Sequence, residues 1–138
     1  MNRILVGIDG SKTSQAAARQ AVELAEKLGA EVHFVTVVKN DDATVLKVST
    51  DEWEISNLLM AESNVRQFIG SLRSSVPYTV AAIEGSPAKA IVTEAERVGA
   101  DLIVVGNVRM QGVSRVLGSV GNSVAHTAPC SVLIVKTV

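Results

Sequence analysis

The sequence predicts one α/β domain, residues 1–138, built on a parallel β-sheet. First, a chain of 138 residues fits one domain and leaves no room for two ordinary ones. Second, hydrophobic residues make up 47% of the chain and aromatic residues only 3%, so the core must consist of Val, Ile, Leu and Ala. Third, short apolar runs alternate with segments of helical periodicity, which is typical of a parallel sheet with helices on both faces.

The first strand and the first helix have clear ends. Residues 4–8 form a continuous apolar run that stops at Asp9, as expected for a buried strand. Ser11 is suited to cap the following helix, and Gly29 is suited to end it. The second strand, rich in Val, covers residues 31–38. The apolar residues expected on one face of the first helix are Ala17, Ala21, Leu24, Ala25 and Leu28.

A long second helix follows a segment without a clear period. Residues 39–49 have mixed polarity, and we expect them to form a loop. Pro77 lies just beyond the end of the helix, and residues 78–83 form the third strand. The apolar residues that mark the helix are Ile55, Leu58, Leu59, Val65, Ile69 and Leu72.

The third helix begins with a recognisable pair of residues. Ser86 is suited to the N-cap and Pro87 to the first helical position, where the missing N–H of proline has no consequence. The helix ends at Gly99, and residues 101–105, which are apolar after Asp101, form a fourth strand that ends at Gly106. The helix residues expected to face the sheet are Ala88, Ile91, Val92, Ala95 and Val98.

The last two elements complete the alternation. Residues 120–127 predict a short helix, Pro129 ends it, and Ser131–Val135 is the fifth strand. In an open parallel sheet, ligands bind at the carboxyl ends of the strands, where the strand order reverses. The candidate site therefore lies in the loops after the first, second and fourth strands.

The loop after the fourth strand has the composition of a phosphate site. It contains glycines at positions 106, 112, 118 and 121, and Ser119 lies where the next helix opens. Glycines let backbone amides approach phosphate oxygens, and a helix N-terminus adds free N–H groups. Arg109 and Arg115 could add charge-assisted hydrogen bonds. The same glycines also fit a surface loop that needs them for turns.

Asp9 has two interpretations. At the end of the first strand it is placed to accept hydrogen bonds from sugar hydroxyls, as acidic residues do in related sheets. It also suits the turn before the first helix, where a carboxylate caps backbone amides. Both interpretations stay open from the residues alone.

Composition argues against several classes of partner. The formal net charge of −1 gives no electrostatic attraction to nucleic acid or to an acidic membrane. No apolar run approaches the ~20 residues of a membrane span. Asp9 interrupts the first apolar run too early for a secretory signal. We therefore expect a cytoplasmic protein that binds neither nucleic acid nor membrane.

The other reactive residues give weaker signals. His33 and His126 have no Asp or Glu at ligand spacing, so a structural role is favoured over catalysis or metal binding. Cys130 is the single cysteine; it excludes an internal disulfide and is expected to be a packed thiol. Trp53 fits a core residue, a dimer contact or a lid. No pair of nucleophile and base is visible, so no catalytic residue is assigned.

Several segments resemble the universal stress protein family, in order and along the whole chain. The resemblance implies an adenine-nucleotide alpha-hydrolase-like α/β fold, with an open, doubly wound five-stranded parallel sheet of order 3-2-1-4-5. It also implies a homodimer formed through the last strand, Ser131–Val135. The resembling segments are residues 6–11 (VGIDGS), 85–88 (GSPA), 100–106 (ADLIVVG), 117–120 (LGSV) and 128–135 (APCSVLIV).

The family includes members that bind ATP and others that do not. The ATP motif is Gly, two residues, Gly, about nine residues, and then Gly-Ser or Gly-Thr. Gly106 and the pair Gly118-Ser119 match its ends, but Arg109 replaces the middle glycine and the spacer is one residue short. The Arg109 side chain would either obstruct the phosphates or supply a cation to them.

The resemblance implies a set of nucleotide-binding residues. The ligand is ATP, or alternatively AMP or cyclic AMP, with Mg²⁺ as a possible companion. Asp9 would contact the ribose or base, the backbone of Val37 the adenine, and the amides of Ser119 and Val120 the phosphates. The full set is Ile8, Asp9, Val37, Gly106, Asn107, Arg109, Gly112, Gly118, Ser119 and Val120.

Three functions follow as hypotheses. The first is a regulatory protein of the stress response that binds an adenine nucleotide, with ATP favoured. The second is a slow ATP-using enzyme, with at most weak ATP hydrolysis. Residues 9–14 match neither the Ser-Gly-Gly-x-Asp-Ser loop of related pyrophosphatases nor the paired histidines of related synthetases. The third is a dimeric interaction module that binds no nucleotide.

Overall fold

The computed structural model describes residues 1–38, 51–106 and 119–136, without the side chains of residues 51–57 and 119. Strands and helices alternate along these residues, as predicted. The elements are β1 (Arg3–Gly7), α1 (Lys12–Leu28), β2 (Glu31–Val38), α3 (Asp51–Leu72), β3 (Tyr78–Glu84), α4 (Pro87–Val98), β4 (Leu102–Gly106), α5 (Ser119–Thr127) and β5 (Ser131–Val135). The first and fourth strands are each displaced by one residue from the predicted bounds. The loop predicted at residues 39–49 lies outside the described residues.

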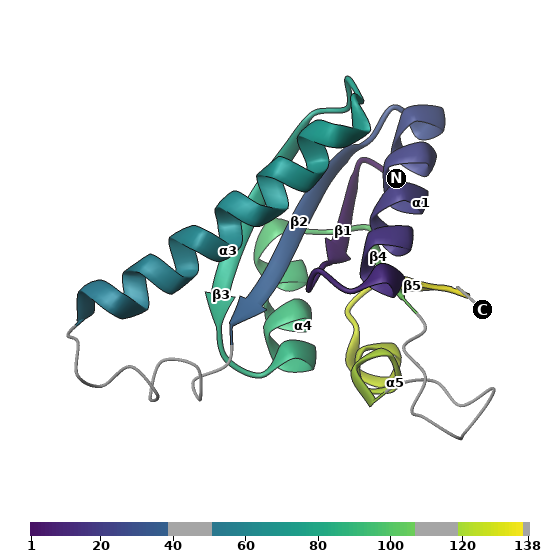
Figure 1. The fold of residues 1–138 in the computed structure, drawn as a ribbon. Helices are drawn as coiled ribbons and strands as arrows, with labels where there is room; N and C mark the ends of the chain where they lie inside the picture. The colour runs from purple at the N-terminus through teal and green to yellow at the C-terminus, as the bar shows by residue number, and fades with distance from the viewer. Residues whose placement is uncertain (39–50, 107–118, 137–138) are drawn as a thin grey trace.

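All five strands are parallel and follow the order β3-β2-β1-β4-β5, which confirms the predicted fold class. The direction of the crossovers changes at β1, which pairs with β2 on one side and with β4 on the other. Helices α1 and α3 cover one face of the sheet, and α4 and α5 cover the other (Figure 1). The switch point of the sheet therefore lies between β1 and β4.

Each face of the sheet has its own apolar core. Phe34 is fully buried in the same core as Ala17 and Ala21 of α1, whose small side chains let the helix approach the sheet. On the opposite face Leu5 and Ile103 pack with α4 and α5. Alternate residues of one strand serve the two cores, since side chains alternate across a sheet. Burial on both faces explains why the strands read as continuous apolar runs.

The predicted helix ends are largely confirmed. The Ser11 side chain accepts a hydrogen bond from the backbone N–H of Ser14, 3.2 Å away. Gly29 and Gly99 end their helices in the left-handed region, at φ of 67° and 65°. Ser86 precedes α4 as predicted, but its side chain makes no capping hydrogen bond. Its carbonyl instead accepts from the N–H of Ala90 at 2.9 Å.

Two apolar residues predicted to be buried are exposed. Leu28 is 47% exposed because it is the last residue of α1, and Ala30 takes the buried position beyond it. Leu59 is 61% exposed because the first half of α3 extends past the end of the sheet (Figure 1). In the second half of α3, Val65 and Ile69 are buried as predicted. In both cases the helical periodicity correctly predicted a helix, but it gives no information on where the sheet beneath the helix ends.

Candidate functional site at the carboxyl edge of the sheet

The structure brings the described candidate residues to one edge of the sheet. Asp9 follows β1, Val37 is near the end of β2, and Gly106 is the last residue of β4. Since all strands are parallel, these three ends lie on the same side (Figure 1). Ser119 is the first residue of α5, although its side chain is not described. The candidates outside the described residues are Asn107, Arg109, Gly112 and Gly118.

Asp9 is held in the turn that leads into α1. Its Oδ1 accepts a hydrogen bond from the N–H of Ser11 at 2.9 Å, and its own N–H donates to the Ser14 hydroxyl at 3.1 Å. Desolvation acts to raise the pKa of Asp9, but the hydrogen bonds from Ser11 and Ser14 outweigh it and lower the pKa. The exposed carboxylate is therefore ionised at neutral pH and can accept further hydrogen bonds. The Asp9 carboxylate thus has a structural role in the turn, and it can still accept a hydrogen bond from a ligand.

Val37 lies where β2 continues beyond its neighbour. The N–H of Ile8 donates to the carbonyl of Val35 at 2.9 Å, which is the last hydrogen bond from the end of β1 to β2. Backbone groups of alternate residues point to the same side of a strand. The N–H and C=O of Val37 therefore face the side of β1, past the point where β1 ends. Among the described residues, β1 offers these two groups no partner, because its last residue, Gly7, is opposite Val35.

Ile8 and Val120 contribute apolar side chains rather than polar contacts. Ile8 is buried at 4% exposure in the core under α1 and α3. Val120 is partly buried against the core under α4 and α5. Any contact of either residue with a polar ligand group must therefore come from its backbone.

Gly106 has a packing role that the sequence analysis did not foresee. A Cβ added at this position would lie 2.8 Å from the carbonyl oxygen of Thr13, in the first turn of α1. The backbone of Gly106 is not in the left-handed region, so space alone restricts the residue. The absence of a side chain lets β4 and the start of α1 come together beside Asp9.

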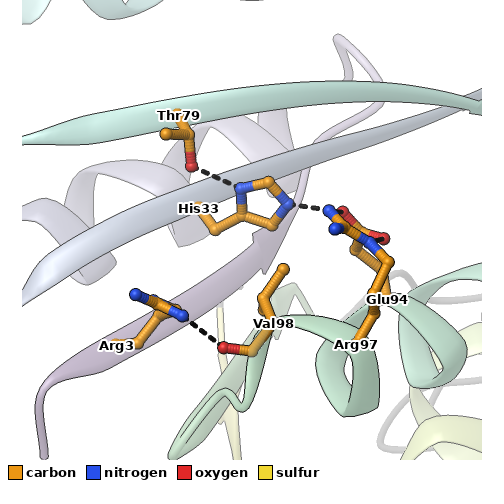
Figure 2. Close-up of polar contacts among 6 residues, drawn as sticks. All are labelled: Arg3, His33, Thr79, Glu94, Arg97 and Val98. Atoms are coloured by element: carbon orange, nitrogen blue, oxygen red, sulfur yellow. Dashed lines mark hydrogen bonds and ion pairs between the residues drawn. The ribbon is translucent and has the colours of Figure 1, made fainter.

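A buried polar network lies between the sheet and α4 (Figure 2). Its strand residues, His33 and Thr79, are near the starts of β2 and β3, away from the carboxyl edge. His33 Nε2 lies 2.7 Å from Glu94 Oε2, and His33 Nδ1 lies 2.5 Å from the Thr79 hydroxyl. Arg97 donates to both oxygens of Glu94, at 2.7 Å each. His33 and Glu94 are only 6% and 5% exposed.

The charges of this network stabilise the Glu94 carboxylate. Hydrogen bonds from Arg97 lower the pKa of Glu94 and outweigh the opposing effect of burial. With a further hydrogen bond from His33, the pKa of Glu94 falls to about 2. Sequence reasoning treated His33 as having no acidic partner, because it examined only nearby positions. Glu94 lies 61 residues away, and only the packing of α4 on β2 brings the two together.

The opposite, amino edge of the sheet is fastened by Arg3 and Asp101. The Asp101 carboxylate accepts hydrogen bonds from the backbone N–H groups of Asn2 and Arg3, at 2.8 and 3.0 Å, and these bonds lower its pKa. The Arg3 guanidinium donates to the carbonyl of Val98 at the end of α4 (Figure 2), and it also pairs with Glu31. Asp101 is thus an exposed carboxylate in a backbone-binding role, far from the candidate site.

Other features of the described residues bear on function. None of the described helices has both the length and the apolar character needed to cross a bilayer. Among the side chains that the structure describes, no three of His, Cys, Asp or Glu gather as metal ligands. Burial and the nearby charge of Asp101 raise the pKa of Cys130, which packs against the α4 and α5 core.

Comparison with known proteins identifies relatives along nearly the whole chain. The model of the universal stress protein family matches residues 1–136. A universal stress protein of Methanocaldococcus jannaschii is 34% identical over 139 residues, which cover 97% of this chain and 81% of that protein.

Solved structures of the same kind share the fold. The universal stress protein UspA from Lactobacillus plantarum is 26% identical with a TM-score of 0.75, and 97% of each chain is covered. A universal stress protein in complex with cAMP is 27% identical, also with a TM-score of 0.75, over 99% of this chain and 98% of that one.

Proposed function

The chain belongs to the universal stress protein family, and we propose that it binds an adenine nucleotide at the carboxyl edge of its sheet. The observation that carries the proposal is the backbone edge of Val37, which extends past the end of β1 on the side where Asp9 follows that strand with an ionised carboxylate. An adenine ring offers a matching donor and acceptor edge, and a ribose offers hydroxyl groups. The relative in complex with cAMP, 27% identical over nearly its whole length, supports the choice of an adenine nucleotide.

Each part of the nucleotide has a proposed partner. Val37 meets the adenine through its backbone, and Asp9 accepts a hydrogen bond from the ribose. The amides of Ser119 and Val120, at the start of α5, bind phosphate, since a helix N-terminus favours anions. Gly106 and Gly118-Ser119 match the ends of the family's ATP motif, which favours ATP over AMP and cyclic AMP. Arg109 then supplies a cation to the phosphates.

Unfolding measurements with and without nucleotide test this proposal. A nucleotide present at 100 times its dissociation constant should raise the free energy of unfolding by ~2.7 kcal/mol. The measurement compares these nucleotides at millimolar concentration: ATP with Mg²⁺, ATP without Mg²⁺, ADP, AMP and cyclic AMP. If none of them changes the unfolding transition, the proposal fails and the nucleotide-free interaction module replaces it. Product analysis after long incubation with ATP tests the slow-enzyme alternative.

Asp9→Asn should weaken nucleotide binding about 5- to 10-fold, or ~1–1.5 kcal/mol, as expected for one lost hydrogen bond. The asparagine keeps an oxygen for the N–H of Ser11, so the turn is preserved. Its NH₂ group cannot accept from a ribose hydroxyl. Titration calorimetry with ATP and with adenosine measures the loss, which should be similar for both ligands.

Asp101→Asn is the matched control for this prediction. It makes the same substitution at an exposed carboxylate that binds backbone amides, but at the amino edge of the sheet. Its nucleotide affinity should stay within about 2-fold of wild type. An equal loss in both variants would show that Asp9 acts through general stability and not through the ligand.

We further propose that the chain forms a homodimer through β5. This strand is at the edge of the sheet, and Val132, Leu133 and Ile134 are apolar and only partly buried. An apolar edge strand invites pairing, and a twofold symmetric partner is the commonest arrangement. Light scattering at micromolar concentration should give twice the mass of the chain. A monomer mass would contradict the dimer without bearing on nucleotide binding.

A further inference from the structure

The buried network around His33 contains a hydroxyl, an imidazole and a carboxylate in series. His33 and Thr79 are direct partners in the register of β2 and β3, so their side chains lie side by side on the α4 face. Glu94 reaches the other nitrogen of the imidazole from α4 (Figure 2). Thr79 is exposed, whereas His33 and Glu94 are buried. The series therefore has one end open to solvent.

The direction of the hydrogen bonds follows from the charge of Glu94. Its pKa of about 2 keeps the carboxylate ionised, so it only accepts hydrogen bonds. Nε2 of the His33 imidazole must then carry a hydrogen and donate to Glu94. When the ring carries this one hydrogen, Nδ1 is the acceptor for the Thr79 hydroxyl, which lies 2.5 Å away. This is the arrangement in which an imidazole can remove the hydroxyl proton.

We propose that Thr79 is an activated nucleophile that takes up acyl groups from small activated esters, with His33 as its general base. Glu94 is the positioning residue, because it fixes the hydrogen on Nε2 and holds the ring. Arg97 in turn holds Glu94 through two hydrogen bonds. His33 is the third residue of β2, so this site is separate from the candidate nucleotide site at the carboxyl edge.

The step balances without any further reactant. Thr79 Oγ1 attacks the ester carbonyl carbon while its proton passes to Nδ1 of His33. The tetrahedral intermediate collapses, the bond to the leaving alkoxide or phenolate breaks, and Thr79 is left as an O-acyl ester. The proton moves from Nδ1 of His33 to the leaving group or to water, which regenerates the base.

Acyl transfer fits the surroundings of Thr79 better than phosphoryl transfer. Phosphoryl transfer needs cations at the reacting group, but Arg97, the cation of this network, is bound to both oxygens of Glu94. Acyl transfer needs N–H donors for the developing oxyanion. β3 is an edge strand of the sheet. Pro77 O accepts from Val32 N–H and Gly85 N–H donates to Val38 O, so the odd-numbered residues direct their backbone groups towards β2. The N–H of Val80 therefore points away from β2. In the part of the chain that the structure describes, no strand lies on that side of β3, so the amide next to Thr79 is placed to stabilise that charge.

Acetylation of the wild-type protein by p-nitrophenyl acetate tests the proposal, with peptide mass mapping over time. Thr127 is the internal control, because it is exposed and its hydroxyl donates to the carbonyl of Ser123, which is no base. General base catalysis contributes 10²-fold or more, so Thr79 should be acetylated about 100-fold faster than Thr127. Hydroxylamine should remove the acetyl group from Thr79, as it does from esters and not from acetylated lysines.

Variants separate nucleophile from base. Thr79→Ser should keep the fast acetylation and Thr79→Val should abolish it, while His33→Gln should slow it to the rate of Thr127. The wild-type comparison needs no substitution, so it decides the matter even where a buried variant fails to fold. Acetylation of Thr79 no faster than that of Thr127 would overturn the proposal.

Discussion

Replacing Glu94 with Gln should lower the free energy of unfolding by about 2–3 kcal/mol at pH 7. The carboxylate is 5% exposed and binds two cationic or donor partners, so the uncharged amide loses charge-assisted hydrogen bonds inside the protein. A pKa lowered from 4.5 to about 2 corresponds to a contribution of this order. Arg97 is 66% exposed, so solvent screens its interaction with Glu94 and keeps the expected loss of stability nearer to about 2 kcal/mol than to 3.

The effect should depend on pH in a defined direction. The pKa of Glu94 is lower in the folded protein than in the unfolded chain, so its stabilisation is fully present above pH 4.5. It is lost as the pH falls from 4.5 towards 2. Urea unfolding at pH 7, 5, 4 and 3 measures the difference between wild type and Glu94→Gln, which should shrink over that range.

Glu62→Gln is the control for the pH series. Glu62 pairs with Arg66 at 3.0 Å on the surface of α3, and such exposed pairs contribute little. The variant should remain within about 0.5 kcal/mol of wild type at every pH. A constant difference between wild type and Glu94→Gln from pH 7 to 3 would show that Glu94 acts through shape and not through charge.

Gly106→Ala should cost about 1–3 kcal/mol of stability, the usual cost of overpacking. The new methyl group would lie 2.8 Å from the carbonyl oxygen and 3.0 Å from the carbonyl carbon of Thr13. Both are backbone atoms, so relief requires α1 to move away from β4 and cannot come from a side-chain rotation. Thermal and urea unfolding measure the loss.

Gly70→Ala is the matched control. Gly70 lies in α3 and has open space around its Cα, so the same methyl group meets nothing. Alanine is the better helix former, and this variant should be stabilised by about 0.5–1 kcal/mol. If Gly106→Ala were as stable as wild type or more stable, the proposed packing role of Gly106 would be wrong, and the glycine at this position would need another explanation.

Much of the fold could be predicted from the sequence because local signals and the hydrophobic pattern agree. Gly29 and Gly99 take the left-handed conformation that their positions indicated, and Ser11 caps α1 with its side chain. The order 3-2-1-4-5 came from the family resemblance and is confirmed. The exposure of Leu28 and Leu59 could not be predicted, since periodicity identifies a helix face but not the extent of the sheet beneath it.

The candidate site could be predicted in part. Parallel topology was enough to place Asp9, Val37 and Gly106 at one edge, and the structure has them there. The contact between Gly106 and Thr13 and the pair of His33 with Glu94 could not be foreseen. Both join residues that are distant in the sequence, and neither leaves a periodic or spacing signal.

Titration calorimetry of the wild-type chain with ATP, ADP, AMP and cyclic AMP tests the central claim most directly. Binding at the carboxyl edge predicts a saturable heat for at least one of them, with a single nucleotide per chain, and a weaker affinity in Asp9→Asn but not in Asp101→Asn. The absence of heat with all four nucleotides at millimolar concentration would contradict the claim.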